Sequence, residues 1–390
     1  MSVELRRARR GVTIVFWLNA VAWASVLPRF PEIKRELVIA DLPWGVYLSL
    51  ASIVGMLSGM LSARLLRRFR SAQVVSVTQT CAMASLLLFA VVDSPVLFVL
   101  ALTTMSAFDS VCDIAMNHHG MRVQVGYGRS ILNGFHAWWS VGAVSGGLIG
   151  AGLAQAGVPL MWQCVALTAV FVALTRYART LLLAGDDPRP VGGDDGAAPR
   201  RIRPQAVARL LALGTLGAAA MLLEDSGASW GAVYLDARFQ AAPIVAGLAF
   251  VALQGAQMVG RFTGDRIVDA LGPRLTVLSG LGVAAVGTTL ALVWPSPALT
   301  IVGFAAAGWG IATVIPQAMH AGANIPGLPH GTGLTTVTSF LRLGALVGPP
   351  LIGATIETVG LEWGLFVLPV AALVGLATAP ALPHGRAARR

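Results

Sequence analysis

The sequence predicts an all-α integral membrane protein whose twelve transmembrane helices form two pseudo-symmetric six-helix bundles. Three observations support this fold class. The composition suits lipid better than water, the chain contains a series of apolar runs long enough to cross a bilayer, and several motifs recur after about half the chain.

The composition excludes an ordinary soluble domain. Of the 390 residues, 56% are hydrophobic and only 12% are charged, and the mean hydropathy is +0.73. A soluble domain carries about 25% charged residues, and much of its surface must face water. The 44 glycines also suit membrane helices, because small residues let two helices approach closely.

Crossing the hydrocarbon core of a bilayer takes about 20 consecutive apolar residues. Twelve segments meet this requirement, and we expect the spans at 11–28, 43–65, 72–92, 95–118, 132–154, 160–183, 205–230, 242–264, 273–293, 297–320, 332–355 and 361–382. The basic and then apolar N-terminus lacks a small-residue cleavage site, so we interpret it as the first span and not as a removable signal.

The distribution of arginine predicts the orientation in the cytoplasmic (inner) membrane. We number the connections between consecutive spans and place the odd-numbered ones outside the cell. Then 23 of the 28 basic residues, Arg261 among them, fall on the cytoplasmic side, and Arg342 lies within a span. Four fall outside: Arg29, Lys34, Arg35 and Arg238. By the positive-inside rule, both termini are predicted to be cytoplasmic. The net charge of +10 therefore indicates membrane topology, and no nucleic-acid partner is expected, because the basic residues form short clusters between apolar runs.

A polar stretch rich in Gly, Pro and charged residues divides the spans six and six. We therefore expect an N-terminal bundle over 1–184, a cytoplasmic linker over 185–204 and a C-terminal bundle over 205–390. Three residues recur 202 positions later within similar local sequences. The pairs are Gly142 and Gly344, Arg64 and Arg266, and His118 and His320. Three coincidences at one offset indicate two parallel structural repeats.

With these spans, linker and basic motifs, the sequence resembles the major facilitator superfamily of secondary transporters over nearly its whole length. The second half carries the family's loop motif as GRFTGDRIVDALGPR, with Gly260, Asp265 and Arg266. The first half keeps Arg64, Arg67 and Arg68 but has Ala63 where the family usually has Asp. The segments CDIAMNHHG and SILNGFHAWWSVGAVSGG also resemble the rhizopine-transporter-like branch, which is close to fucose-permease-type sugar transporters.

Charged side chains at the centre of a bilayer are costly and usually functional. Five lie clearly inside the expected spans, away from the clusters assigned to the connections: Asp109, Asp113, Glu224, Asp225 and Arg342. The four acids are candidates for proton coupling. Asp109, Asp113 and Asn117 are spaced by four residues and form one helical stripe. This stripe either lines a cavity, or Asp113 and Asn117 tie the fourth span to a neighbour at a gate.

The consecutive acids Glu224 and Asp225 cannot share one helical face, because successive residues are about 100° apart. At least one is expected to be functional; alternatively, the seventh span unwinds near Gly227 and both acids are hydrated. Arg342 requires a counter-charge, which is either one of these acids or a ligand group.

Aromatic and amide side chains near the span centres are candidates for binding a sugar-like solute, with rings against its face and amides on its hydroxyls. This set comprises Asn19, Trp23, Trp139, Gln254, Gln257, Trp309 and Gln317, with Asp109 and Arg342. Each of them also fits ordinary core packing. The residues His118 and His119 are expected to make interfacial hydrogen bonds, and His136 is either a gate residue or a packing residue.

Motifs for phosphate binding, zinc binding and nucleophilic catalysis are absent from the sequence, so we expect no enzymatic activity and no cofactor. The sequence predicts a proton-coupled, monomeric secondary transporter of a small polar solute that works by alternating access. The alternatives are an exporter of a drug or secondary metabolite and a non-transporting membrane sensor. The absence of an arginine in the fourth span and of proline in the fifth argues against a standard drug antiporter.

Overall fold

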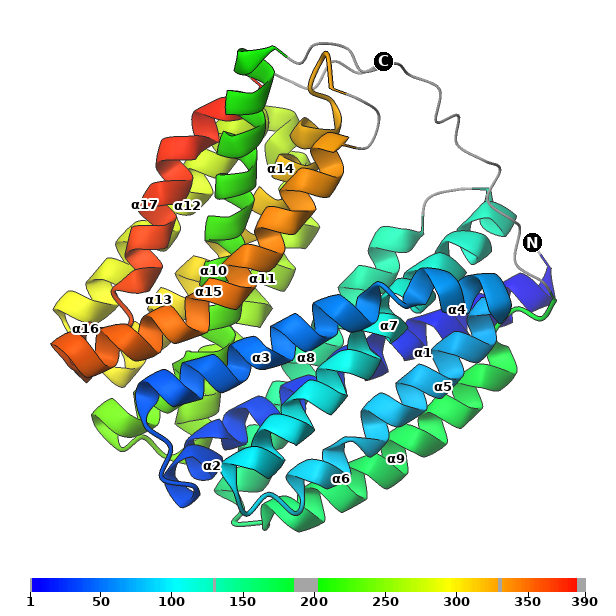
Figure 1. The fold of residues 1–390 in the computed structure, drawn as a ribbon, viewed down its shortest axis with the longest axis horizontal. Coiled ribbons are helices and arrows are strands. Elements are labelled where there is room, and N and C mark those ends of the chain that lie inside the picture. Colours follow the sequence, from blue (N-terminus) through cyan, green and yellow to red (C-terminus); the bar gives the residue numbers. More distant parts are fainter. Residues whose placement is uncertain (1, 129–130, 186–202, 329–331, 384–390) are drawn as a thin grey trace. The chain divides into compact units, whose positions relative to one another are not determined.

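A computed structural model describes residues 2–128, 131–185, 203–328 and 332–383, and these residues are helices and connections without any β-strand (Figure 1). Within these ranges, eleven helices are long and apolar enough to cross a membrane, and a shorter apolar helix follows them. The predicted all-α fold class is therefore confirmed. Most of the predicted linker, 186–202, lies outside the described residues.

The first half of the chain forms nine α-helices and one short 3-10 helix. They are α1 (Val3–Val26), η1 (Leu27–Arg29), α2 (Phe30–Glu36), α3 (Asp41–Gly59), α4 (Ser62–Arg68), α5 (Ser71–Ala84), α6 (Leu86–Phe89), α7 (Pro95–Tyr127), α8 (Leu132–Gln155) and α9 (Leu160–Leu181). The second half forms α10 (Pro204–Phe239), α11 (Pro243–Leu271), α12 (Pro273–Val293), α13 (Pro297–Ile311), α14 (Val314–Ala323), α15 (Thr332–Val359), α16 (Leu361–Gly364), α17 (Val367–Thr378) and η2 (Ala379–Ala381).

Two equivalent helices begin with the same Ser-Pro pair. The hydroxyl of Ser94 accepts a hydrogen bond from the backbone N–H of Leu97 at the start of α7, and the hydroxyl of Ser296 does the same for Leu299 at the start of α13. Serine satisfies an otherwise free N–H at a helix start, and proline fits the first helical position. The local sequence therefore determines both starts, and the two sites are 202 residues apart.

Two predicted spans are interrupted near a proline. The span 297–320 is divided into α13 and α14 at Ala312–Thr313, and the span 361–382 is divided into α16 and α17 at Leu365–Phe366. Pro316 and Pro369 each follow the break at a distance at which the proline ring clashes with the carbonyl four residues earlier. The last predicted span is thus formed by two short helices, α16 and α17.

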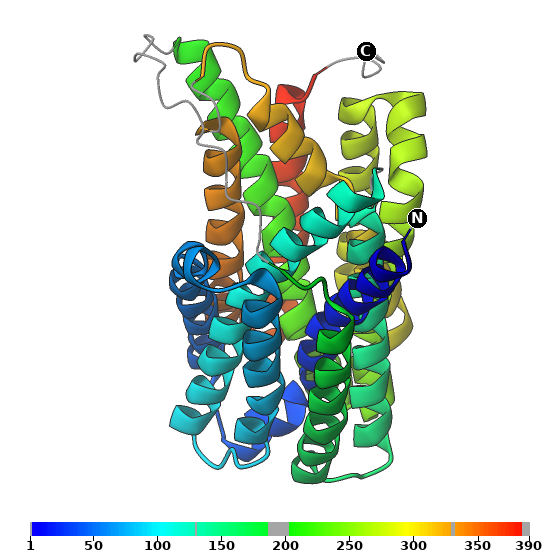
Figure 2. The same ribbon diagram turned by 90° about the vertical axis from the view of Figure 1, so that its right-hand side faces the viewer.

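The chain divides into two compact units. The first contains α1, α2, α4 to α9, most of α3 and the first residues of α11; the second contains α10, α12 to α17, the rest of α11 and the first residues of α3. Within each unit the long helices run side by side (Figures 1 and 2). The most extensive helix contact is that of α1 with α8 in the first unit and that of α10 with α15 in the second.

These two pairs are equivalent in the repeat, and glycine allows the close approach in both. A Cβ atom on Gly142 would overlap the backbone carbonyl of Trp17 in α1, and a Cβ atom on Gly344 would overlap that of Ala218 in α10. Because the two glycines are 202 residues apart, the repeat noticed in the sequence corresponds to the same helix contact in each unit.

A buried arginine closes one end of the first unit. The guanidinium of Arg29 is 3% exposed and donates to Glu32 (2.7 Å), to Gln163 (2.9 Å) and to the backbone carbonyl of Val158. The amide of Gln163 in turn donates to the carbonyl of Ser25. Arg29 was expected in an outside connection, but the structure buries it between the end of α1 and the start of α9.

Candidate functional site

A hydrogen-bonded chain of three side chains lies inside the first unit. The indole N–H of Trp139 in α8 donates to the amide oxygen of Asn19 in α1 (2.9 Å). The amide nitrogen of Asn19 then donates to a carboxylate oxygen of Asp109 in α7 (2.6 Å). Because Trp139 can only donate and the carboxylate can only accept, these two partners determine the orientation of the Asn19 amide.

This chain lies near the middle of the long helix α7. Asp109 is fourteen residues after Pro95 and eighteen before Tyr127, or about 21 Å and 27 Å at about 1.5 Å per residue. Asn19 is only 5% exposed. The structure therefore brings together three residues that the sequence nominated separately, at a depth where a carboxylate is costly unless it has a partner or a function.

A second polar contact joins α7 to α5 one helical turn from Asp109. The thiol of Cys112 donates to the amide oxygen of Gln79 (2.8 Å), and both side chains are fully buried. The amide nitrogen of Gln79 has no hydrogen-bond partner in the described structure. This pair was not predicted, although a glutamine inside the apolar span 72–92 is visible in the sequence.

Farther along α7, the polar stripe connects to α8. The amide nitrogen of Asn117 donates to the backbone carbonyl (2.9 Å) and the carboxylate (3.1 Å) of Asp113, and its oxygen lies 3.1 Å from Nε2 of His136. Because that oxygen can only accept, Nε2 of His136 must carry a proton. Asp113 and His136 are exposed, and the His136 ring contacts Phe16 edge-on. Asn117 thus links α7 to α8 through His136, and its bonds to Asp113 stay within α7.

His119, which follows Asn117 by two residues on α7, forms hydrogen bonds with α5 and with the segment after α9. His119 is 1% exposed; its Nδ1 lies 2.7 Å from the Ser71 hydroxyl, and its Nε2 accepts the backbone N–H of Leu183 (3.3 Å). The side chain of Arg122 donates to the carbonyls of Ala184 and Gly185. His119 thus makes the expected hydrogen bonds as a buried bridge from α7 to the start of α5 and to the segment that follows α9.

In the second unit, a charged pair joins α10 and α11. Nη2 of Arg261 lies 3.7 Å from a carboxylate oxygen of Glu224, and the two side chains are 36% and 12% exposed, respectively. From the sequence, Arg261 was assigned to the connections on the cytoplasmic side of the membrane. In the structure it lies within a helix, ten residues before the end of α11. This helical position could have been predicted, because residue 261 falls inside the predicted span 242–264.

The ion pair and the course of α10 correct two expectations. Glu224 pairs with Arg261 and not with Arg342, whose side chain is exposed on α15. The helix α10 is continuous from Pro204 to Phe239, so the proposed unwinding near Gly227 is wrong. The carboxyl group of Asp225 is half-buried, on a different face of α10 from that of Glu224.

The remaining substrate-binding candidates are distributed among several helices. Gln254 and Gln257 are buried in α11, and Trp309 in α13 and Gln317 in α14 are half-buried. The half-buried ring of Trp23 packs edge-on against Phe30 at 6.1 Å. In the described structure, no hydrogen bond joins Trp23 or Gln317 to the clusters above.

The residues of the loop motif fall into two groups. Gly260 is buried, and a Cβ atom there would lie 2.5 Å from that of Ala312, beside the break between α13 and α14. The charged residues are exposed: Arg64, Arg67 and Arg68 in α4, and Asp265 and Arg266 in α11. The glycine therefore serves helix packing, whereas the charges remain available to partners.

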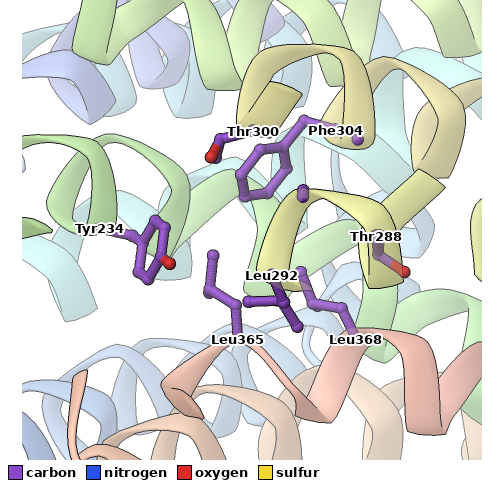
Figure 3. A pocket seen from close by; sticks show the side chains of 9 residues that line it. Tyr234, Thr288, Leu292, Thr300, Phe304, Leu365 and Leu368 are labelled. Atoms are coloured by element: carbon purple, nitrogen blue, oxygen red, sulfur yellow. The ribbon is translucent and has the colours of Figure 1, made fainter. Parts of the chain in front are cut away.

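Among the described residues, no group of three or more His, Cys, Asp or Glu side chains is placed to hold a metal ion. A pocket lies within the second unit among α10, α12, α13 and the broken helix α16–α17 (Figure 3). Its lining is mainly apolar, with Phe304, Leu365 and Leu368, and it also includes the hydroxyl-bearing side chains of Tyr234 and Thr300. None of the predicted site residues lines it.

Solved structures of transporters share this architecture. A point variant of the nucleoside transporter NupG superposes with a TM-score of 0.75 at 13% identity, covering 96% of this chain and 98% of NupG. A bacterial homolog of the human lysosomal transporter Spinster, in an inward-facing and unoccupied conformation, gives a TM-score of 0.73 at 14% identity and covers 98% of both chains. The chain has the fold of the major facilitator superfamily.

Sequence relatives agree with this fold. An MFS-type transporter of Yersinia pestis is 28% identical over 365 residues, which is 92% of this chain and 93% of that protein. The membrane protein MosC of Rhizobium meliloti is 28% identical over 373 residues, or 94% and 88% of the two chains. No protein-family model matches the sequence. The expected resemblance to this superfamily is confirmed, and the protein is a membrane transporter and not an enzyme.

Proposed function

We propose that this transporter moves a small polar solute of the sugar or polyol type by alternating access, in exchange with or together with protons. The bundles over 1–184 and 205–390 would rock about a site near the middle of the membrane. We further propose that it works as a monomer in the cytoplasmic membrane with both termini in the cytoplasm.

The observation that carries this proposal is the chain of hydrogen bonds from Trp139 through Asn19 to Asp109. It combines an amphipathic aromatic ring, an amide and a carboxylate, which are groups that bind the faces and hydroxyls of polar rings. In the described structure, the Asn19 amide is the one hydrogen-bond partner of the Asp109 carboxylate. Such a carboxyl group can carry a proton between the two sides of the membrane as its surroundings change.

Flux measurements in proteoliposomes test this function. Labelled sugars and polyols, together with a nucleoside because NupG is named as a nucleoside transporter, are offered with an imposed pH gradient or an imposed sodium gradient. We expect at least one solute to accumulate when the pH gradient is imposed. Flux that follows sodium and ignores pH would contradict proton coupling.

The variant Asp109→Asn tests the role of the carboxyl group. It keeps the size of the side chain but cannot release a proton, so we expect accumulation driven by the pH gradient to be lost while solute exchange continues. Asp93→Asn is the matched control, because Asp93 is exposed in the connection between α6 and α7. Accumulation by Asp109→Asn at the level of the control would remove Asp109 from the coupling mechanism.

A further inference from the structure

A strongly basic segment follows α3 in the first unit. Arg64, Arg67, Arg68 and Arg70 lie within seven consecutive residues, and all four side chains are exposed. Among the described residues, no acidic side chain forms an ion pair with Arg64, Arg67 or Arg68. The guanidinium of Arg68 lies over the ring of Phe69, 5.6 Å from the ring centroid. Three of these charges are therefore not neutralised by the described part of the chain.

The equivalent segment of the second half lacks this charge. At the offset of 202, residues 63–70 correspond to residues 265–272. The first stretch contains four arginines and no acid, a formal charge of +4, whereas the second contains Arg266 with Asp265 and Asp269, a formal charge of −1. A role in helix packing that both halves share does not require this difference, so the excess charge has a role in the first unit alone.

The arginines of α4 share one side of the helix, opposite the side that packs. Arg64, Arg67 and Arg68 are spaced as i, i+3 and i+4, which places their side chains within about 100° around the helix. Leu65 and Leu66, on the opposite side, pack against the buried core of the first unit. The core thus fixes α4 so that three guanidinium groups point the same way and can converge on one anion.

This segment lies close to the level of the lipid headgroups. The helix α3 has 19 residues and rises about 28 Å at about 1.5 Å per residue, which is close to the ~30 Å thickness of the hydrocarbon core. The helix α4 begins three residues after the end of α3 and contacts α5 and α7 (Figure 1). Its arginines are therefore within reach of phosphate groups at the membrane surface.

Large apolar side chains flank the arginines and are also exposed. Leu57 in the last turn of α3 and Met60 and Leu61 in the following connection are 55%, 71% and 49% exposed, and Phe69 is 45% exposed. A free phosphate ion would contact only the arginines. A phospholipid also covers the apolar side chains with its acyl chains, so one molecule uses both features of this surface.

We propose that residues 57–70 bind an anionic phospholipid such as phosphatidylglycerol, with its phosphate on Arg64, Arg67 and Arg68 and its acyl chains against the exposed apolar side chains. A guanidinium group binds phosphate through two parallel hydrogen bonds, and a basic cluster beside a membrane helix attracts anionic lipids. A zwitterionic headgroup also carries an ammonium group, which the cluster of arginines repels. The site does not depend on the transported solute, and in the proposed orientation it faces the cytoplasmic leaflet.

Thermal unfolding of the purified full-length transporter in detergent tests the site. The probes are short-chain phosphatidylglycerol, phosphatidylcholine with the same acyl chains, and inorganic phosphate. The variant R64Q/R67Q/R68Q removes the three charges from exposed positions. Should it fail to fold, Arg67→Asp replaces it, since aspartate is the residue type at the equivalent position 269.

Two further variants complete the test. The matched control R7Q/R176Q/R179Q removes three other exposed arginines of the first unit, from α1 and α9. Met60→Ser keeps every charge but removes an apolar side chain that is 71% exposed, so it distinguishes a lipid from a free anion.

We expect phosphatidylglycerol, but neither phosphatidylcholine nor inorganic phosphate, to raise the Tm of the wild type and of the control. Each lost arginine should weaken the apparent affinity for phosphatidylglycerol about fivefold, so that of R64Q/R67Q/R68Q should fall on the order of a hundredfold. Arg67→Asp should weaken it by about fivefold or more, since it also adds a negative charge. Met60→Ser should weaken it about threefold, because apolar contact with an acyl chain is lost.

An equal loss of affinity in the control R7Q/R176Q/R179Q would overturn this inference, because the attraction would then be spread over the whole basic surface. Stabilisation by phosphatidylcholine, or by inorganic phosphate, to the same extent as by phosphatidylglycerol would also overturn it, as would an unchanged affinity in R64Q/R67Q/R68Q or the absence of any shift in the wild type. The proposed transport of a polar solute is decided separately by the flux measurements.

Discussion

Replacing Arg29 with methionine should destabilise the first unit strongly. Arg29 is 3% exposed and donates to Glu32, Gln163 and the Val158 carbonyl. Methionine fills a similar volume with flexible apolar atoms, so the change removes the hydrogen bonds without leaving a large cavity. The end of α1 would then lose its polar connection to the start of α9.

The expected magnitude follows from the groups left behind. Two neutral acceptors, on Gln163 and Val158, lose their donor, and an unpaired buried acceptor costs about 1–3 kcal/mol. Glu32 is 30% exposed, so water compensates for most of its lost ion pair, which adds about 0–1 kcal/mol. The total is about 2–7 kcal/mol, which for a unit of this size lowers the Tm by at least about 4 °C and by up to about 28 °C.

The free cysteines of the chain provide the assay. Cys112 and Cys164 are buried, and a thiol-reactive fluorescent dye therefore reports unfolding on heating in detergent. Arg35→Met is the matched control, because Arg35 is exposed in α2 only six residues away. We expect the control to unfold close to the wild type. A Tm for Arg29→Met within about 2 °C of that of the control would refute the reasoning.

Three further predictions concern single contacts. Trp139→Phe keeps the ring but removes the N–H that orients Asn19, so the solute affinity measured in proteoliposomes should fall several-fold, whereas Trp138→Phe, at a residue 49% exposed, should match the wild type. Gly142→Ala should lower the Tm, because its methyl group would overlap a backbone carbonyl of α1, whereas Gly152→Ala, with nothing within 4 Å, should be neutral or slightly stabilising. His119→Ala should speed hydrogen exchange at the amide that its ring accepts at the end of α9, and exchange at the wild-type rate would contradict the proposed bridge.

Much of the fold follows from local properties of the sequence. Apolar runs of about 20 residues predict spans because lipid cannot satisfy a free backbone, so each run must form its own helical hydrogen bonds. The Ser-Pro pairs at Ser94 and Ser296 determine helix starts, because a cap acts within one turn, and Pro316 and Pro369 each follow a break by a few residues. The breaks were nevertheless missed, since hydropathy averaged over a span does not register a single proline.

The candidate site was only partly predictable. The sequence shows that Asn19, Asp109 and Trp139 are unusual at membrane depth, because a polar group in lipid stands out in its own helix. It does not show which groups meet. An acid of the seventh span was one of the two partners considered for Arg342, because both were recognised as intramembrane charges, whereas Arg261 was counted among the basic residues of the inside connections.

The sequence by itself determined that this chain is a helical membrane protein with a repeated half, because hydropathy, charge clusters and a fixed offset are properties of the chain read in order. Only the tertiary structure decided that Asn19 links Trp139 to Asp109, that Glu224 pairs with Arg261, and that Cys112 donates to Gln79. These contacts depend on the rotation and relative height of packed helices, and a few residues of sliding between two helices would exchange every partner.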